Sequence, residues 1–526
     1  MKMLVVLCYG YFALRRLITY LHIFQQEEYD SVRFLNWLVR CAAFDRRATA
    51  LLVILGLVST ARLLPLPVVY SLVALILVVL AYFEDDPRYS GKKRLVMTQR
   101  AKRILVGASV IAALSGLYVG VFSWAVWAWI VAVQILPFSL VLSNVGLAPY
   151  EDSVQRRFWR EAQTKLEEIR PITVGITGSY GKTTVKHILG HILDTQAPTL
   201  ITPGSVNTTM GIARIVREQM RPHHRFFVCE MGAYGPGSIS RLTRLARPNL
   251  AIITAVGHAH YERFKTLETV ARTKFELADA VVHGGGKVIV AEGVLEQPAP
   301  REFASRHEGS TVAVGAGPAC ALRIHNVRQS QDGIGLDVTW GGKSYALCAP
   351  LFGEHQAINI ALAFAAACEL GVEPGQAVIA LASVPQINHR LEVKRQPRGS
   401  IVVDDAYNSN PVGFASALRI LDLLRGNGGR RILVTPGMVE LGSAHDEEHA
   451  KIGALAASHV DVLLPVLPDR IVSLIAAYVA GNPHGTVIPF ASFAEAQAWL
   501  TASLGPGDVV LIENDLPDLY EKKFRL

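Results

Sequence analysis

Two long stretches in the N-terminal third of the chain are almost purely apolar. Residues 104–150 contain no Asp, Glu, Lys or Arg, and residues 48–83 contain only one such residue, Arg62. A membrane-spanning helix takes about 20 apolar residues, so each stretch is long enough for two helices joined by a turn. We place the turns beside Pro65 and near Gly116–Gly120. Buried helices of a soluble domain would show amphipathic spacing, which these runs lack.

The segment between the two apolar stretches sets their orientation. Residues 87–103 carry seven cations, namely Arg88, Lys92, Lys93, Arg94, Arg100, Lys102 and Arg103, whereas the two predicted turns carry only Arg62. Positively charged loops stay in the cytoplasm, so two hairpins return the chain to the cytoplasm at Glu151. The first apolar run, Met3–Leu14, ends at a pair of arginines. The pattern leaves open whether it is a short fifth crossing or an interfacial helix.

The net charge of the whole chain is +8, and the excess of cations falls entirely within residues 1–170. There it is interleaved with apolar runs. This arrangement favours a membrane surface as partner and argues against nucleic acid.

Beyond a charged linker helix at 151–170, short β-rich runs alternate with helical ones. The predicted strands are Ile172–Ile176, Phe226–Glu230, Leu250–Val256 and Lys287–Ala291. Such alternation is typical of a parallel sheet with helices on both faces. The predicted fold class is therefore an α-helical membrane region, residues 1–150, followed by α/β domains at 171–388 and 389–526.

Each α/β domain has further predicted elements. In the first, residues 311–350 form a small β excursion with a turn at Gly341–Gly342, and residues 351–370 form an apolar helix. The second is predicted to be a smaller Rossmann-like domain, with strands near Ile401–Asp404, Arg431–Thr435, Val460–Val466, Thr486–Phe490 and Asp508–Glu513.

The candidate chemistry starts at residues 174–186, V-G-I-T-G-S-Y-G-K-T-T-V-K, a strand followed by a glycine-rich loop and a helix start. Such a P-loop cradles the phosphates of a nucleoside triphosphate. We assign the cradle to Gly178, Ser179, Gly181, Lys182, Thr183 and Thr184. Lys182 supplies a cation for the outer phosphates, and the Thr183 hydroxyl is a magnesium ligand. The loop departs from the general P-loop pattern because Ile176 stands where the first glycine belongs.

Three further residues follow in chain order. Glu230 ends a predicted strand, which places a carboxylate beside the phosphate loop as a second magnesium ligand. His260 lies just beyond the next strand, and Lys274 lies on the helix after it.

At this point the chain resembles a known family, the Mur ligases. The resemblance rests on T-G-S-Y-G-K-T-T, C-E-M-G-A, G-H-A-H-Y-E, T-K-F-E-L, G-E-H-Q-A-I-N-I-A-L-A, N-H-R-L-E and V-V-D-D-A-Y-N-S-N-P, in this order over residues 171–515. The last of these and M-V-E-L-G are most similar to the MurF branch, the D-alanyl-D-alanine-adding enzymes.

The resemblance implies roles by position. Lys182 would contact the γ-phosphate of ATP, and Thr183 and Glu230 would hold one Mg²⁺. His260 would hold a second Mg²⁺ together with Lys274, modified by CO₂ to a carbamate. Asn359 would touch the adenine, and Arg390 and Asp405 would reach the nucleotide from the last domain.

Two departures from the family concern the acceptor. The family opens with a domain that binds a UDP-linked acceptor, and here the apolar region takes that position. The late K-G-S-R-type segment is E-N-D-L-P, Glu513–Pro517, which removes a cation. Both departures leave ATP activation in place.

The sequence therefore predicts a membrane-anchored, ATP-dependent carboxylate–amine ligase of cell-wall precursor synthesis. Its predicted substrates are a small-molecule or lipid-linked carboxylate and an amino acid or dipeptide amine. We expect several crossings of a bacterial-type inner membrane, with the catalytic domains cytoplasmic. Two alternatives are a folylpolyglutamate or poly-γ-glutamate type synthetase, which shares this chemistry, and a membrane scaffold that binds ATP without ligase activity.

Overall fold

The computed structural model describes residues 1–89, 94–123, 125–257, 266–407, 409–439 and 441–514. The chain divides into two compact units, the first spanning Met1–Arg156 and the second Arg157–Asp515.

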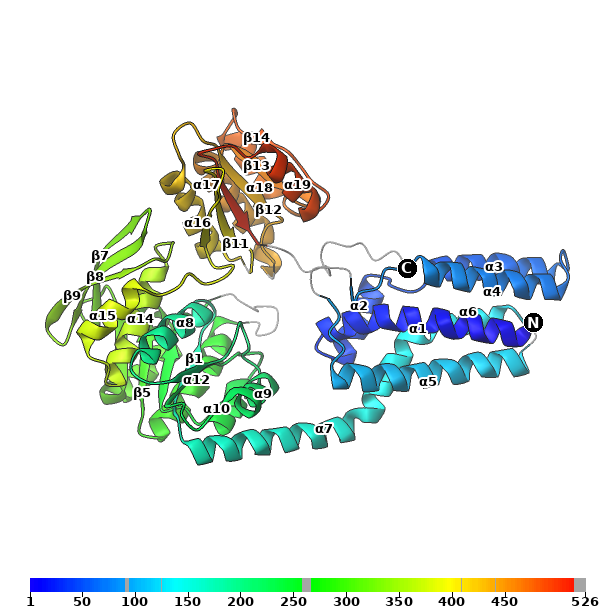
Figure 1. The fold of residues 1–526 in the computed structure, drawn as a ribbon, viewed down its shortest axis with the longest axis horizontal. Coiled ribbons are helices and arrows are strands. Elements are labelled where there is room, and N and C mark those ends of the chain that lie inside the picture. Colours follow the sequence, from blue (N-terminus) through cyan, green and yellow to red (C-terminus); the bar gives the residue numbers. More distant parts are fainter. Residues whose placement is uncertain (90–93, 124, 258–265, 408, 440, 515–526) are drawn as a thin grey trace. The chain divides into compact units, whose positions relative to one another are not determined.

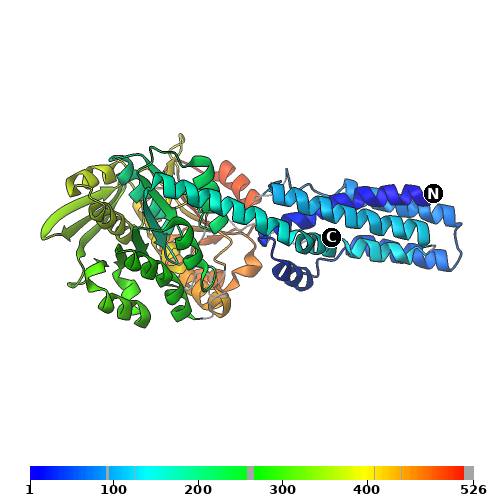
Figure 2. The same cartoon turned by 90° about the horizontal axis from the view of Figure 1, so that it is seen from below.

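The first unit is helical throughout its described part. Helices α1, α4 and α5 pack side by side, and α3 packs against α4 and α6 (Figures 1 and 2). The helices are α1 Lys2–Gln26, α2 Ser31–Arg40, α3 Arg46–Thr60, α4 Leu66–Tyr82, α5 Gln99–Phe122, α6 Trp127–Gln134 and α7 Leu136–Ile169, the last of which continues into the second unit.

Two helices of the described chain, α1 and α5, are long and apolar enough to cross a membrane, and α6 with α7 makes a third if this pair, bent by 45°, is one span. Helices α3 and α4 have 15 and 17 residues, and they are joined by a turn at residues 61–65 as the prolines predict. The number of crossings stays a prediction.

The predicted turn near Gly116–Gly120 is wrong, because α5 continues through both glycines to Phe122. Each glycine faces α1 at close range. A Cβ on Gly116 would lie 2.5 Å from the ring of Tyr9, and a Cβ on Gly120 would lie 2.4 Å from Val6. Glycine serves close helix packing here and does not mark a turn.

Helix α1 also runs without a break through its two arginines. Arg16 is buried and forms ion pairs with Asp45 at 2.8 Å and Glu84 at 3.0 Å. Arg15 pairs with Asp86 at 2.9 Å. Since acids from the α2–α3 and α4–α5 connections neutralise both arginines, the charged pair does not end the helix.

The second unit contains two sheets. The larger has the order β2-β3-β1-β4-β5-β6-β7-β8-β9 and is parallel up to β7, then antiparallel (Figure 1). Its strands are β1 Ile172–Thr177, β2 Thr199–Ile201, β3 Phe226–Glu230, β4 Leu250–Ile253, β5 Lys287–Ala291, β6 Thr311–Gly315, β7 Leu322–Ser330, β8 Gly333–Trp340 and β9 Lys343–Ala349.

Helices cover this sheet, and its core is a continuous apolar cluster. They are α8 Lys182–Asp194, α9 Thr209–Gln219, α10 Ser238–Ala246, α12 Leu267–His283, α13 Pro298–Arg306, α14 Gln356–Glu369 and α15 Pro374–Ala382, with 3₁₀ turns η1 Glu292–Glu296 and η2 Glu308–Ser310.

The four strand predictions for this sheet are confirmed: β3 and β5 have the predicted bounds, β1 is one residue longer, and β4 is shorter. Strand β4 ends at Ile253 because Thr254 and Ala255 bond the phosphate loop: Thr254 donates its hydroxyl to the carbonyl of Tyr180, and Ala255 accepts from Ser179 N. The predicted β excursion forms β6–β9 with its turn at Gly341–Gly342. The apolar helix starts at Gln356, since Gly353 has a φ of 96°.

The smaller sheet has the order β10-β11-β15-β12-β13-β14 and is parallel except for β10. Its strands are β10 Glu392–Arg395, β11 Ile401–Asp405, β12 Arg431–Thr435, β13 Val462–Pro465, β14 Thr486–Val487 and β15 Val509–Glu513; its helices are α16 Pro411–Leu424, α17 His445–His459, α18 Val472–Gly481 and α19 Phe493–Ser503, with η3 Gly442–Ala444 and η4 Pro468–Arg470. The register of β11 and β15 sets Asp405 opposite Glu513 at their C-terminal ends.

Candidate functional site

The phosphate loop between β1 and α8 needs glycine at two positions. Gly181 precedes α8 with a φ of 81°, and a Cβ there would lie 2.4 Å from Asn359 Oδ1. A Cβ on Gly178 would lie 1.9 Å from Thr254 Oγ1. Because neither residue carries a side chain, the backbone amides at the start of α8 stay accessible to an anion.

Lys182, the first residue of α8, folds back over this loop. Its Nζ donates to the carbonyl oxygens of Gly178 at 2.8 Å and Ser179 at 3.5 Å. Burial lowers the pKa of Lys182, and the charge of Glu230 opposes that shift. Both hydrogen bonds go to backbone carbonyls, which leaves the amine beside the loop where a phosphate would bind.

Two more predicted cradle residues support the loop. Ser179 Oγ donates to the carbonyl of Gly257 at 3.1 Å and accepts from Gly257 N at 2.9 Å. Thr184 is buried in the first turn of α8. The hydrogen bonds of Ser179 and the burial of Thr184 thus hold the loop in shape.

Glu230 lies beside the loop as the strand pattern predicts. Strands β1 and β3 are neighbours with Ile176 opposite Glu230, and the carboxylate is 1% exposed. Its Oε2 accepts from the Thr183 hydroxyl at 2.8 Å, and its Oε1 accepts from Asn207 Nδ2 at 3.2 Å. A hydroxyl and a carboxylate are oxygen donors of the kind Mg²⁺ takes, so these residues fit a magnesium ion.

Lys186 belongs to the same cluster and was missed by sequence reasoning. It is fully buried one turn after Lys182, with Nζ 3.5 Å from Glu230 Oε2 and a hydrogen bond to the carbonyl of Gly204. Lys186 lies four residues after Lys182, so both lysines are on the same face of α8, and this spacing could have predicted that Lys186 lies near the site.

Lys274 lies on α12 and is 4% exposed. Burial lowers its pKa well below the usual value, and the charge of Lys182 lowers it further. The neutral amine is the form that reacts with CO₂, so this environment fits a carbamate. His260, its predicted partner at the second metal, lies outside the described residues.

Asn359 approaches the loop from α14, which packs against α8. Its Oδ1 faces Gly181, and its Nδ2 donates to Gln356 Oε1 at 2.8 Å. The amide thus lies beside the phosphate loop, and the predicted contact with adenine stays a prediction.

The smaller sheet contributes Arg390 and Asp405. The guanidinium of Arg390 lies 4.3 Å from the ring centre of Tyr407, and Asp405 Oδ1 accepts from Leu391 N at 3.2 Å. Burial raises the pKa of Asp405 to about 6, although the charge of Arg390 opposes the shift.

A cavity of about 290 Å³ brings most of the predicted nucleotide residues together. It is lined from the larger sheet by Ser179, Gly181, Lys182, Thr183, Thr184, Glu230 and Asn359, and from the smaller by Arg390, Asp405 and Tyr407. Lys274 and Gly178 are not among its lining residues.

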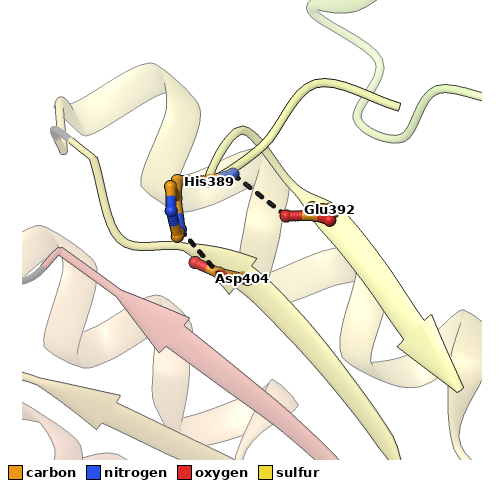
Figure 3. A group of neighbouring side chains, drawn as sticks. All are labelled: His389, Glu392 and Asp404. Carbon is orange, nitrogen blue, oxygen red and sulfur yellow. Dashed lines mark hydrogen bonds and ion pairs between the residues drawn. The ribbon is translucent and has the colours of Figure 1, made fainter. Parts of the chain in front are cut away.

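A second group of potential ligands is His389, Glu392 and Asp404 on and beside β10 and β11 (Figure 3). His389 Nδ1 lies 2.9 Å from Asp404 Oδ2. Lys394 Nζ already lies 2.7 Å from Asp404 and 3.0 Å from Glu392. Because the Lys394 ammonium neutralises Asp404 and Glu392, we interpret this group as an ion-pair cluster that stabilises the hairpin of β10 and β11.

The loop, the carboxylate that ends β3 and the cavity lined from two α/β sheets define a two-domain α/β protein with a candidate phosphate-binding site. The family follows from comparison with known proteins. Residues 176–367 match the Mur ligase middle domain, and residues 389–513 match the Mur ligase, glutamate ligase domain. The chain belongs to the Mur ligase family.

Among its relatives is UDP-N-acetylmuramoyl-tripeptide--D-alanyl-D-alanine ligase of Bacillus subtilis (strain 168), 29% identical over 56% of this chain and 62% of that protein. The enzyme of the same name from Mycobacterium tuberculosis (strain ATCC 25618 / H37Rv) is 31% identical over 65% of this chain and 69% of its own length. The chain thus spans about three fifths of the length of the first relative.

Among solved structures, the MurF ligase from Thermotoga maritima in complex with ADP superposes with a TM-score of 0.59 at 24% identity, over 70% of this chain and 82% of that one. At this identity the likeness establishes a shared fold.

Proposed function

We propose that the protein is an ATP-dependent ligase that joins a carboxylate to an amine in the synthesis of peptidoglycan precursors. The contact of Thr183 with Glu230 beside Lys182 carries the proposal, because it combines a phosphate cradle with a metal-binding carboxylate. The relatives supply the reaction class, since their names describe addition of D-alanyl-D-alanine to a UDP-linked tripeptide.

The reaction has two steps. An oxygen of the acceptor carboxylate attacks the γ-phosphorus of ATP, the bond to the β-phosphate oxygen breaks, and an acyl phosphate and ADP form. The amine nitrogen then attacks the acyl carbon, the C–O bond to phosphate breaks, and the amine loses a proton as the amide forms. Lys182 binds the γ-phosphate oxygens and stabilises the charge that builds up there.

The other residues hold and orient the reactants. Thr183 and Glu230 would hold one Mg²⁺, and His260 with carbamylated Lys274 would hold a second. The bound metals would supply positive charge that neutralises the phosphate oxygens. Asn359 orients the nucleotide from the loop side, and Arg390 and Asp405 orient it from the smaller sheet.

We further propose that the first unit anchors the enzyme in the bacterial inner membrane with the second unit in the cytoplasm. Support comes from large apolar side chains on its surface, which include Leu7, Leu63, Leu114 and Val131, each more than 60% exposed. An apolar surface of this kind is costly in water and stable in lipid. The acceptor proposed on this basis is a lipid-linked cell-wall precursor.

The test is ATP turnover by the purified full-length protein with and without bicarbonate and candidate amines. Lys182→Ala abolishes turnover while the circular dichroism spectrum is retained, and the exposed Lys343→Ala serves as control. Turnover at the wild-type rate in Lys182→Ala overturns the proposal. ATP binding without turnover supports a scaffold, and turnover only with glutamate and a folate or polyglutamate acceptor supports the other synthetase class.

A further inference from the structure

We propose that Glu513 is a protonated carboxylic acid at neutral pH and donates a hydrogen bond to Asp405, which makes it a positioning residue for the carboxylate that faces the nucleotide. The consequence for the nucleotide rests on the proposed function. The protonation of Glu513 itself does not depend on it.

The register of two strands brings the two acids together. Strands β11 and β15 are parallel neighbours, and Asp405 and Glu513 are paired at their last positions. Glu513 is fully buried and Asp405 is 8% exposed. Asp405 lines the cavity with Arg390, whereas Glu513 is not among the lining residues.

The hydrogen bonds available to Glu513 satisfy only one of its oxygens. Oε1 accepts from the Ser409 hydroxyl. Among the described residues no donor reaches Oε2, although that atom has no exposed surface. A buried carboxylate oxygen without a donor costs free energy, and a protonated oxygen in the same place becomes a donor itself.

The partner that such a donor can reach is Asp405, the register partner of Glu513 at the end of the neighbouring parallel strand. Two ionised carboxyls on paired positions of neighbouring strands in a buried site would repel each other strongly. Burial raises the pKa of Glu513 well above its usual value, and the charge of Asp405 raises it further. The pair therefore shares one proton near neutral pH.

The surroundings assign that proton to Glu513. Asp405 accepts from Leu391 N and is subject to the positive charge of Arg390, and both favour its ionised form. Asp404 opposes this with a like charge, but its own carboxylate forms an ion pair with Lys394 at 2.7 Å. The hydroxyl of Ser409 donates to Glu513 and lowers the pKa of that carboxyl, but burial and the charge of Asp405 raise it by more.

The resemblance to the Mur ligases implies a lysine at position 513, where this chain has glutamate. A lysine there would hold Asp405 by an ion pair. Glu513 holds the same carboxylate with a neutral donor, so the negative charge of Asp405 is left for Arg390 and for the hydroxyl groups of a ligand. A lysine and a protonated glutamate at position 513 would both orient Asp405, but the lysine would add a positive charge next to it and the glutamate would add none.

The first experiment measures protonation without any nucleotide. Infrared difference spectra of the full-length protein at neutral pH compare the wild type with Glu513→Gln. We expect a protonated-carboxyl band in the wild type that is lost in the variant, while the exposed Glu447→Gln leaves that band unchanged. The absence of such a band in the wild type overturns the proposal.

The second experiment measures the affinity for a non-hydrolysable ATP analogue by calorimetry as a function of pH. In the wild type, the affinity falls at alkaline pH as Glu513 loses its proton. Glu513→Gln donates a hydrogen bond at every pH, so this alkaline decline disappears. Glu513→Ala lacks the donor and binds about tenfold more weakly throughout.

The two experiments separate the inference from the function on which it builds. An alkaline decline that persists unchanged in Glu513→Gln overturns the positioning role. A wild type that shows the carboxyl band but binds no ATP analogue overturns the proposed function and leaves the protonation of Glu513 established.

Discussion

The hydroxyl of Thr183 donates a 2.8 Å hydrogen bond to the carboxylate of Glu230, from a residue 47 positions away in the chain. Glu230 ends β3, and Thr183 lies in the first turn of α8, which follows the neighbouring parallel strand β1; open α/β sheets bind ligands at this edge. The contact joins the phosphate cradle to the proposed magnesium ligand, and Lys186 holds the same carboxylate from behind.

Glu230→Gln tests this relationship. The amide has nearly the same shape but no charge, so we expect the affinity for Mn²⁺ in the presence of ADP to fall about tenfold or more. Electron paramagnetic resonance of Mn²⁺ measures the loss directly. Glu218→Gln, at an exposed glutamate on α9, is the matched control. Equal Mn²⁺ affinity in the two variants would show that Glu230 is not a ligand.

Short-range patterns were enough to predict most of the larger sheet and the loop. A run of apolar residues followed by glycines and a lysine identifies β1, the loop and α8 within fifteen or so residues, because strand, turn and helix start each have a local signal. Glu230 could be placed because the end of a strand is also a local feature. The predicted β4 was too long. Thr254 directly follows the apolar run of β4 and looks like part of the strand, but its hydroxyl donates a hydrogen bond to the phosphate loop.

Features that depend on distant partners could not be predicted. Glycine favours both turns and close helix contacts, so Gly116 could be assigned only once Tyr9 was seen against it. Arg16 looked like the end of an apolar segment because its partners Asp45 and Glu84 lie elsewhere in the chain. The pairing of Asp405 with Glu513 depends on a register between strands more than 100 residues apart.

Lys274 provides a second prediction. Its buried position keeps the amine neutral enough to react with CO₂. Lys274→Ala should lose roughly two orders of magnitude in ligase activity, the scale for removing one group that stabilises charge in a transition state. Acetate or formate in the buffer should restore part of it by filling the space of the carbamate. Lys274→Arg, which cannot form a carbamate, should show no rescue. Unchanged activity in Lys274→Ala would refute the assignment.

The acid stability of the smaller α/β domain depends on Asp508. Burial raises the pKa of its carboxyl, but hydrogen bonds from Arg430 and Gly505 outweigh burial and hold the pKa below its ordinary value of 3.8. A depressed pKa means that the stabilisation is present above pH 3.8 and is lost as the pH falls through the folded-state value.

Asp508→Asn should therefore lower the free energy of unfolding at pH 7 by about 2 kcal/mol and flatten its decline below pH 4. Urea unfolding at several pH values measures both effects. Asp469→Asn, at an exposed aspartate of the same domain, is the control. An acid decline as steep in Asp508→Asn as in the wild type would contradict this account.

The topology of the first unit gives a fourth prediction. The cations between residues 87 and 103 favour the cytoplasm, so reporters fused after Arg103 and after Leu526 should both report a cytoplasmic location. A third reporter at residue 1 decides whether α1 crosses the membrane. A periplasmic signal after Arg103 or Leu526 would mean that the crossings are miscounted.

The last prediction concerns the acceptor. The family match begins at residue 176, and the position of the family's first domain is occupied by helices with apolar surfaces. A membrane-anchored active site searches the thin layer at the inner leaflet, where a lipid-linked substrate is already concentrated. Cations such as Arg88 and Arg94 would attract a pyrophosphate-linked lipid if they lie near head groups, as the predicted topology places them.

The purified enzyme in detergent should therefore ligate a lipid-linked muramoyl tripeptide at least about tenfold more efficiently than UDP-muramoyl tripeptide, measured as kcat/KM with the same amine. Both acceptors are compared in matched micelles with D-alanyl-D-alanine and with other amines. Replacing Arg88 and Arg94 by Gln should raise KM for the lipid-linked acceptor and lower the salt dependence of that KM. The KM for UDP-muramoyl tripeptide should not change. The two substitutions remove positive charge at the membrane surface and leave the ATP site intact. Efficient ligation of UDP-muramoyl tripeptide with none of the lipid-linked form would show that the helices serve as an anchor and that a soluble acceptor enters the site unaided.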